Sequence, residues 1–397
     1  MTIHGFTGFE SGEVAIELSA VSSATLSSSV KRTGEYSLRC NPTAGNQSVT
    51  YGGIQANGTI ANASLGAAGA GLANVYVTDY LYIATLPNVD TEITRSHFGG
   101  NTQFQVVLRT TGALGLYYVN GSDVLTQIGS DSATLSTATW YRIEIKGTAL
   151  DTGGSSTVEC KLEGTVFATA GSLTVRSTPS VAGSIVLGNP TTAATMDIHF
   201  DDMVVRDDQY HGAAKVWRLA PDGDGTLATG FDAGTGSTFG ELDDLPNDGD
   251  TSYWSATVAN NTRSVTVAAP SSVVGTVAAV SAIGILKRVT NGNHSLRVRV
   301  GTTNADSTAA NPGGAYVGRG KITEADPSTS AAWTIAGVGA VEVGVIHTGS
   351  TQTRITSICA MVLEDGVLVP SAGAPAGRSR AVMANRRRGR NRMMGVG

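Results

Sequence analysis

Short runs rich in Val, Ile, Thr and Tyr recur along the 397-residue chain, and almost no segment has the apolar spacing of an amphipathic helix. Residues 295–300 alternate strictly between polar and apolar side chains, and residues 140–146 alternate in the same way. Such alternation places one face of a strand against a core and the other face in water. Clusters of Gly, Asn, Asp and Ser separate the runs, as turns require. The chain is therefore predicted to be all-β.

The expected strands form two groups, because the texture of the sequence changes between residues 213 and 240. Gly and Asp dominate there, and Asp-Gly-Asp-Gly at 222–225 predicts turns. We place a domain boundary near residue 212 and expect two β-sandwich, jelly-roll-like domains, at 1–211 and 212–365. The expected strands are 74–86, 104–109, 114–119, 140–146, 158–168, 184–187, 196–206, 252–258, 263–268, 272–287, 295–302, 332–336, 340–348 and 353–363.

Positive charge is concentrated at the end of the sequence. Of the 27 Lys and Arg residues, seven lie in the last twenty positions, and no Asp or Glu follows Asp365. Residues 1–377 carry 20 basic and 32 acidic residues, a net charge of about −12, while the end carries about +7. Without apolar periodicity or acidic partners, residues 366–397 are expected to form an extended basic arm that does not fold alone. The seven arginines are Arg378, Arg380, Arg386, Arg387, Arg388, Arg390 and Arg392.

Arginine supplies every charge of this arm, and its guanidinium group suits two-point contacts with carboxylates and phosphates. The interpretation we favour is docking on an acidic groove of another protein. Contact with nucleic acid, whose affinity would depend on salt, is the first alternative. A solvated tail without a partner is the second.

Other composition features exclude several classes. The first twelve residues have neither a basic nor an apolar region, so no secretory signal is expected. The most apolar stretch, 273–286, is shorter than the roughly 20 residues that a membrane-spanning helix needs, so no membrane partner is expected. Cys40, Cys160 and Cys359 are far apart and lack CxxC spacing, which predicts buried apolar residues rather than a disulfide framework or a zinc site.

Asp222 and Asp224 are the best candidates for a metal site. Carboxylates are hard oxygen ligands, and the Asp-x-Asp-Gly spacing is that of the start of a calcium loop. The twelfth position of such a loop would need a glutamate and holds Ala233 instead. We therefore favour aspartates that cap turns over calcium ligands, and we expect no other cofactor.

Catalysis by paired carboxylates has little support in the sequence. Glycoside hydrolysis needs two carboxyl groups roughly 5–10 Å apart. Glu144 has Arg142 as its nearest neighbour on the same strand face, and Glu159 and Glu163 are four strand residues apart, roughly 13 Å, with Lys161 between them. The six histidines are scattered singly. We expect no enzymatic activity.

Several motifs resemble those of known families. Residues 8–10 with 33–39, the Trp-led strand at 139–144 and the Asp-Asp strand at 198–205 resemble, in this order, the strands of concanavalin A-like and laminin G-like jelly rolls. Residues 222–254 resemble a β-rich module of structural proteins of tailed-bacteriophage particles. Together the two resemblances imply a component of the virion.

The jelly-roll resemblance also implies ligand sites. Acidic residues near the rim of some laminin G-like domains hold calcium, so Asp201 and Asp202 are candidates, although a structural role at the strand is favoured. Lectin-like jelly rolls bind sugars on exposed aromatic side chains. The available aromatic residues are Tyr76, Tyr80, Tyr82, Tyr117, Tyr118 and Trp140.

The function expected from these observations is that of a non-enzymatic virion protein, a capsid decoration, neck or tail accessory component. Its arm would anchor it to other virion proteins, and a rotationally symmetric homo-oligomer, such as a trimer, is expected. One alternative is a glycan-binding module that attaches the particle to its host. A polysaccharide-degrading enzyme is a weaker alternative, because no stretch matches the Glu-x-Asp-x-x-Glu strand of concanavalin A-like hydrolases.

Overall fold

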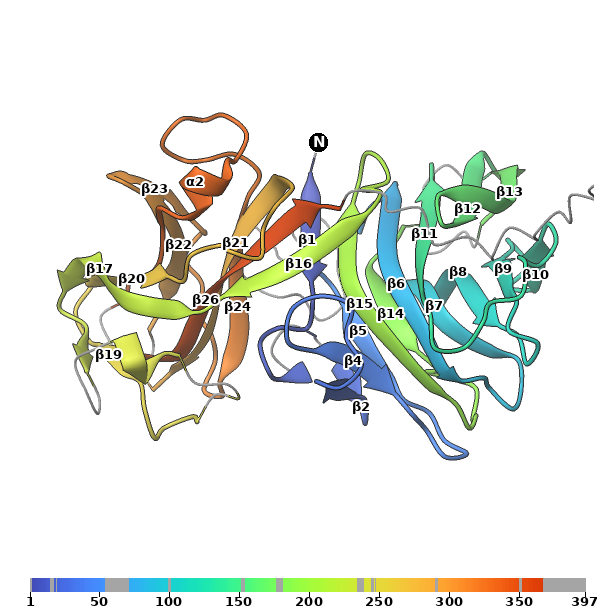
Figure 1. The fold of residues 1–397 in the computed structure, drawn as a ribbon, viewed down its shortest axis with the longest axis horizontal. Helices are drawn as coiled ribbons and strands as arrows, with labels where there is room; N and C mark the ends of the chain where they lie inside the picture. Colours follow the sequence, from blue (N-terminus) through green and yellow to red (C-terminus); the bar gives the residue numbers. More distant parts are fainter. Residues whose placement is uncertain are drawn as a thin grey trace, which may run out of the picture. The chain divides into compact units, whose positions relative to one another are not determined.

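The computed structural model describes residues 2–14, 18, 20–53, 71–98, 101–150, 154–175, 181–233, 239–243, 246, 248–289, 292–349 and 352–366. These residues form four antiparallel sheets, so the all-β prediction is confirmed (Figure 1). The arm predicted at 366–397 lies, after residue 366, outside the described residues. No helix within the described part is long and apolar enough to cross a membrane.

Two sheets are built from residues 3–206. Sheet A has the order β13 (Thr165–Leu173), β12 (Ser156–Leu162), β11 (Trp140–Thr148), β6 (Val75–Thr85), β15 (Asp197–Arg206), β4 (Ser37–Cys40) and β3 (Thr25–Ser27), with β1 (Ile3–Thr7) also paired to β15. Sheet B has the order β10 (Leu125–Ile128), β9 (Leu114–Val119), β8 (Asn101–Leu108), β7 (Thr91–Phe98), β14 (Ser184–Gly188), β5 (Ser48–Tyr51) and β2 (Ala20–Ser22).

Two further sheets are built from residues 214–365. Sheet C has the order β18 (Asp232–Ala233), β19 (Trp254–Ala256), β26 (Thr353–Asp365), β21 (Thr276–Arg288) and β24 (Val317–Thr323), with β16 (Ala214–Leu219) also paired to β26. Sheet D has the order β17 (Pro221–Thr229), β20 (Thr262–Val267), β25 (Val341–His347), β22 (His294–Val300) and β23 (Thr303–Asp306). A 3-10 turn, η2 (Phe239–Glu241), and one helical turn, α2 (Ile335–Val338), complete the described elements.

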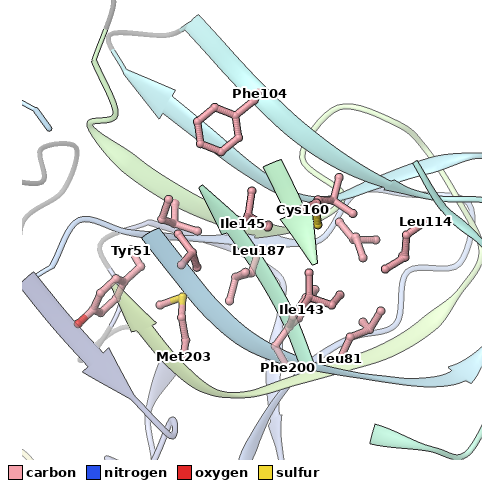
Figure 2. Close-up of a cluster of buried hydrophobic side chains, with 14 of the residues drawn as sticks. Tyr51, Leu81, Phe104, Leu114, Ile143, Ile145, Cys160, Leu187, Phe200 and Met203 are labelled. Carbon is pink, nitrogen blue, oxygen red and sulfur yellow. The ribbon is translucent and has the colours of Figure 1, made fainter. Parts of the chain in front are cut away.

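Each pair of sheets encloses an apolar core. Between sheets A and B, Ile143 and Ile145 of β11 lie in one core cluster with Phe104 and Leu187 (Figure 2). The alternate residues of β11 lie on the opposite face of sheet A. Between sheets C and D, the apolar residues of β22 pack inward in the same alternating manner. The inward faces predicted for both strands are confirmed, but the outer faces are not in water, since Arg142, Glu144 and Arg299 are buried. All three cysteines are free and buried as expected.

A third apolar cluster joins the two pairs of sheets. It contains Phe6 and Val204 of sheet A with Ile283 and Met361 of sheet C. Residues 1–366 accordingly form one compact unit. The division into domains at 1–211 and 212–365 therefore stays a prediction, although no sheet contains strands from both ranges.

Three local predictions were wrong. Residues 158–168 form a hairpin, because Glu163 and Gly164 both have positive φ angles and make a two-residue turn. Residues 222–225 belong to β17, where Gly225 lets the strand approach Ser264 closely. Residues 332–336 form no strand, because α2 begins at Ile335 and its N-cap Thr334 accepts a hydrogen bond from the Gly337 N–H.

Candidate functional site

The residues predicted from sequence to carry function are not gathered at one place. All seven arginines of the arm lie outside the described residues. Asp222 and Asp224 lie on β17, exposed, where the Thr266 hydroxyl donates to Asp222 Oδ1 at 2.7 Å and Arg263 Nη2 donates to Asp224 Oδ1 at 3.2 Å. The cross-strand neighbours thus occupy both carboxylates, and neither aspartate caps a turn.

Asp250, which follows η2 in the sequence, is bound to sheet C by two ion pairs. Asp250 pairs with Lys287 and with Arg354, whose Nη1 lies 2.7 Å from Oδ1, and it accepts the Tyr316 hydroxyl at 2.9 Å. These hydrogen bonds, with that from Lys287 first, lower the pKa of Asp250 to about 2. Within the described residues no group of three or more His, Cys, Asp or Glu side chains could hold a metal ion.

The calcium hypothesis for Asp222 and Asp224 can be tested directly. Because Arg263 already neutralises Asp224, millimolar calcium and an excess of chelator are both expected to leave the melting temperature unchanged. The measurement is differential scanning fluorimetry of the full chain. A calcium-dependent rise that disappears in Asp222→Asn would contradict this expectation.

The carboxylates considered for catalysis are bound by neighbouring groups. Glu144 is buried and pairs with Arg142 at 3.4 Å, as its position on the same strand face predicted. Glu159 pairs with Lys146 at 3.3 Å. Glu163 lies in the β12–β13 turn rather than on the strand, and its Oε1 accepts the Arg142 N–H at 2.7 Å.

Asp201 and Asp202 occupy a bulge of β15 and are fully buried. Asp202 has a φ angle of 50° and accepts hydrogen bonds from the Thr33 hydroxyl at 2.5 Å and the Val216 N–H at 2.7 Å, and it forms an ion pair with Arg32. Asp201 accepts the N–H groups of Arg32 and Asp202 at 2.7 and 2.8 Å. Burial raises the pKa of both carboxyls, and that of Asp201 most.

This bulge links the two pairs of sheets. The Arg32 guanidinium lies 3.4 Å from the centre of the Tyr80 ring and donates to the Ala214 carbonyl at 2.7 Å, and the Ala214 N–H donates to the Tyr80 hydroxyl at 3.3 Å. Side chains of the first sandwich thus bind one edge of β16 while β26 binds the other edge. These contacts fit the structural role favoured for Asp201 and Asp202, because the two carboxylates hold Arg32 and β16 in place.

The candidate aromatic residues lie in three places: the outer face of sheet A, the core and the outer face of sheet B. Tyr80 is buried beneath Arg32, and Tyr82 packs against Trp140 and His199 on the outer face of sheet A. Tyr118 packs against the core. Tyr117, by contrast, lies half-buried on the outer face of sheet B.

A row of polar residues crosses the outer face of sheet B at Tyr117. Strand register places Gln127, Tyr117, Gln105 and Arg95 side by side on four consecutive strands, β10, β9, β8 and β7. Val186 of β14 continues the row. Neither Arg95 nor Gln105 was predicted to carry function, and only Gln105 had a local signal, the alternation of Gln103, Phe104 and Gln105.

Arg109 is fully engaged at one end of this row. Its guanidinium donates to Asp131 at 3.1 Å through both Nε and Nη2, to Asp90 at 3.0 Å and to the Tyr117 hydroxyl at 2.6 Å. These contacts, that with Asp131 first, raise the pKa of Arg109. Gly115 makes room for the group, since an added Cβ would lie 2.9 Å from Asp131 Oδ1.

Arg95 lies on β7, towards the other end of the row, and has far fewer contacts than Arg109. Among the described residues its only ion pair is a long one, 3.5 Å from Nη1 to Glu92 Oε1, and that oxygen already accepts the Thr191 hydroxyl at 2.5 Å. Its Nε is buried and has no hydrogen-bond partner in the described part of the chain. Burial lowers the pKa of Arg95, which Glu92 partly offsets.

Comparisons with known proteins leave the family open. No family model matches the chain, and no curated protein matches it. Solved structures with partial similarity include an endo-β-1,4-glucuronan lyase from the fungus Trichoderma reesei, with 12% identity, a TM-score of 0.35, and coverage of 47% of this chain and 90% of the lyase.

Two other solved structures show similarity of the same degree. Trypanosoma rangeli sialidase has 12% identity and a TM-score of 0.35, covering 52% of this chain, which spans only 30% of the sialidase. A carbohydrate esterase of the Shiga toxin-encoding bacteriophage phi24B has 14% identity and a TM-score of 0.35, covering 52% of this chain and 99% of the esterase. At these TM-scores the similarities assign no function.

Proposed function

We propose that this chain is a non-enzymatic structural protein of a tailed-bacteriophage particle, a capsid decoration, neck or tail accessory component. The observation that carries the proposal is the fusion of two β-sandwiches into one compact unit. A body whose two sandwiches share an apolar cluster suits a component that must hold a fixed place in an assembly. The resemblance of residues 222–254 to a module of phage structural proteins supports the same role.

The absence of activity is part of the proposal. Glu144 and Glu159, the carboxylates that a hydrolase strand would use, are each paired with a cation. Burial raises the pKa of Glu144 while Arg142 lowers it, but glycoside hydrolysis needs two carboxyl groups that flank one bond, and each of these two carboxyls faces a basic side chain instead. Assembly therefore accounts for these residues better than glycoside hydrolysis.

The arm supplies attachment in this proposal. Seven arginines carry about +7 on a chain whose remaining residues carry about −12, so the arm is attracted to acidic partners while the body repels its own copies. Docking on another virion protein is the role we assign to it, and packaged nucleic acid is the alternative partner. We also propose a rotationally symmetric homo-oligomer on the particle, with a trimer as the first case to test.

Replacing the seven arginines from Arg378 to Arg392 by glutamine is expected to reduce incorporation into particles more than tenfold, because each lost arginine removes a charge-assisted contact. A seven-lysine variant, which keeps the charge, should be incorporated at an intermediate level. Incorporation is measured by quantitative mass spectrometry of purified particles. The core clusters lie within residues 3–363, so the melting temperatures of both variants should match that of the parent.

A comparison of particles with and without DNA distinguishes the two candidate partners of the arm, protein and nucleic acid. Docking on protein predicts equal incorporation into filled and empty particles, whereas contact with nucleic acid predicts loss from empty ones. Normal incorporation of the glutamine variant into both kinds of particle would contradict the anchoring role.

Attachment to a host glycan is a second candidate function, and the outer face of sheet B favours it. This face combines the half-buried Tyr117 ring, the Gln105 amide and the incompletely paired Arg95. Aromatic rings and a few convergent polar groups are what sugar-binding surfaces use. Virion attachment and host recognition are compatible, because they would use different parts of the chain.

A further inference from the structure

We propose that the outer face of sheet B binds an acidic polysaccharide, in which a sugar carboxylate pairs with the Arg95 guanidinium. This inference rests on the second candidate function and adds to it a site and a ligand class. The three residues that define the site, Arg95, Gln105 and Tyr117, are direct cross-strand neighbours on β7, β8 and β9. We call them the sheet B row.

Arg95 is the residue of the sheet B row that is best suited to bind a ligand. It is largely buried on a central strand of sheet B, and a guanidinium has five N–H donors to satisfy. In the described part of the chain, Glu92 offers it one contact at 3.5 Å, and its Nε has no acceptor. An outside anion cannot reach the buried Nε, but 15% of the side chain remains exposed and its single ion pair is long. A planar anion that accepts two parallel hydrogen bonds from the exposed part of the guanidinium would therefore be bound favourably.

Arg109, on the same face, has several hydrogen-bond acceptors and serves as a comparison. It has two carboxylate partners, Asp131 and Asp90, and a bond to the Tyr117 hydroxyl. Arg109 therefore acts as a positioning residue, which holds the Tyr117 side chain in place within the sheet B row. The contrast between the two arginines favours Arg95 as the group that would bind an anion.

The charges on the outer face of sheet B limit the kind of anion that can bind there. Two cations, Arg95 and Arg109, are surrounded by three carboxylates, those of Glu92, Asp90 and Asp131. This surplus of negative charge opposes any polyanion at long range, so affinity for an acidic ligand has to come from direct contact of one carboxylate with Arg95 and from neutral groups of the ligand that meet Gln105 and Tyr117. A sugar chain that carries carboxylates supplies both kinds of group, whereas a nucleic acid binds mainly through its phosphates.

The neighbours of Arg95 fit the remaining parts of a sugar. The Gln105 side chain is half-buried on the adjacent strand and carries both a donor and an acceptor for hydroxyl groups. Tyr117 lies one strand further, and its ring offers an apolar surface at the spacing of the strands, about 4.8 Å per strand. The row therefore presents charge, amide and ring in a line across the strands.

The test measures binding of the full chain to a panel of oligosaccharides of galacturonate, glucuronate and sialate by isothermal titration calorimetry. At least one acidic oligosaccharide should bind, and its methyl ester should bind about 10- to 100-fold more weakly, because esterification removes the charge that Arg95 recognises. This comparison uses the unmodified protein, so it does not depend on whether a variant folds.

Variants then assign the site. Arg95→Gln should weaken binding of the acid about 10- to 100-fold and leave binding of the ester unchanged, while Arg95→Lys should lie between. Arg297→Gln is the matched control, because that arginine pairs with Asp306 on sheet D, away from the row. Circular dichroism and melting temperature establish that each variant is folded.

Three outcomes would overturn the inference: no binding to any member of the panel at millimolar concentration, equal binding of acid and ester, or an Arg95→Gln variant that binds the acid normally. The virion proposal is tested separately, since Arg95→Gln should enter particles at the parental level. Loss of glycan binding with normal incorporation would leave the virion role intact. Failed incorporation of the arm variant with normal glycan binding would leave this inference intact.

Discussion

Replacing Asp202 by alanine is expected to lower the free energy of unfolding by about 3–5 kcal/mol. The carboxylate is fully buried and serves Arg32, the Thr33 hydroxyl and the Val216 N–H at once. Alanine would leave the Val216 N–H without this acceptor and, within the described residues, would leave Arg32 and the Thr33 hydroxyl with only the Ala214 and Val216 carbonyls. The left-handed backbone of Asp202, with a φ angle of 50°, would also suit alanine less well. Denaturant unfolding followed by circular dichroism gives the free energy.

Two companion variants distinguish the cause of the loss. Asp202→Asn tolerates the left-handed backbone and keeps an acceptor oxygen but loses the charge, so it should cost less than alanine. Asp306→Ala removes an ion pair at the surface, where Asp306 contacts Arg297 at 2.7 Å, and should cost about 1 kcal/mol or less. If Asp202→Ala were as mild as Asp306→Ala, the buried contacts at the bulge would not stabilise the fold.

A second large effect is expected from Asp79, whose carboxyl lies in the core between sheets A and B. It is fully buried, its Oδ2 accepts only a long hydrogen bond of 3.4 Å from Thr94, and its Oδ1 has no partner among the described residues. Burial raises the pKa of Asp79 from 3.8 to about 7. The folded protein therefore keeps a proton that the unfolded chain has already released.

The consequence is a loss of stability as the pH rises. Between about pH 4 and pH 7 the folded state holds the Asp79 proton and the unfolded state does not, so the free energy of unfolding falls by about 4 kcal/mol over this window and stays low above it. Asp79→Asn has no proton to release. The variant should be more stable than the parent at pH 8, and its advantage should shrink towards pH 4.

The difference between parent and Asp79→Asn, measured by denaturant unfolding at a series of pH values, isolates this group from others that titrate. Asp306→Asn is the control, because its carboxylate is partly exposed and paired with Arg297. A parent–variant difference that does not change with pH would show that Asp79 titrates normally in the folded state.

The fused body affects how function is tested. A fragment that ends at residue 211 would remove β16, whose Val216 N–H and Ala214 carbonyl bind Asp202 and Arg32. It would also expose the apolar cluster shared by sheets A and C. Experiments on glycan binding therefore use the full chain rather than the isolated first sandwich.

Much of the fold could be predicted because it depends on local pattern. The alternation in 140–146 and 295–300 assigned the inward and outward faces of β11 and β22 correctly. Errors arose where turn chemistry or close packing prevailed over composition, as at Glu163–Gly164 and at Asp222–Gly225. The ion pair of Glu144 with Arg142 was predictable for the same reason, since both lie on one face of one strand.

The candidate site could not be predicted in this way. Arg95, Gln105 and Tyr117 are separated by ten or more residues and become neighbours only through strand pairing. Whether Arg95 is satisfied depends on what its neighbours already bind, and Thr191, nearly a hundred residues later, takes the same Glu92 oxygen. No local pattern contains that information.

The sequence by itself determined the all-β class, the faces of its most regular strands and the separation of an acidic chain from a basic end, because each is a property of consecutive residues. Only the tertiary structure decided that the two sandwiches share an apolar cluster, that Asp202 reaches across to Val216 and that Arg95 stands incompletely paired in the sheet B row. These depend on strand register and on the bulge of β15, which set contacts between residues far apart in the chain.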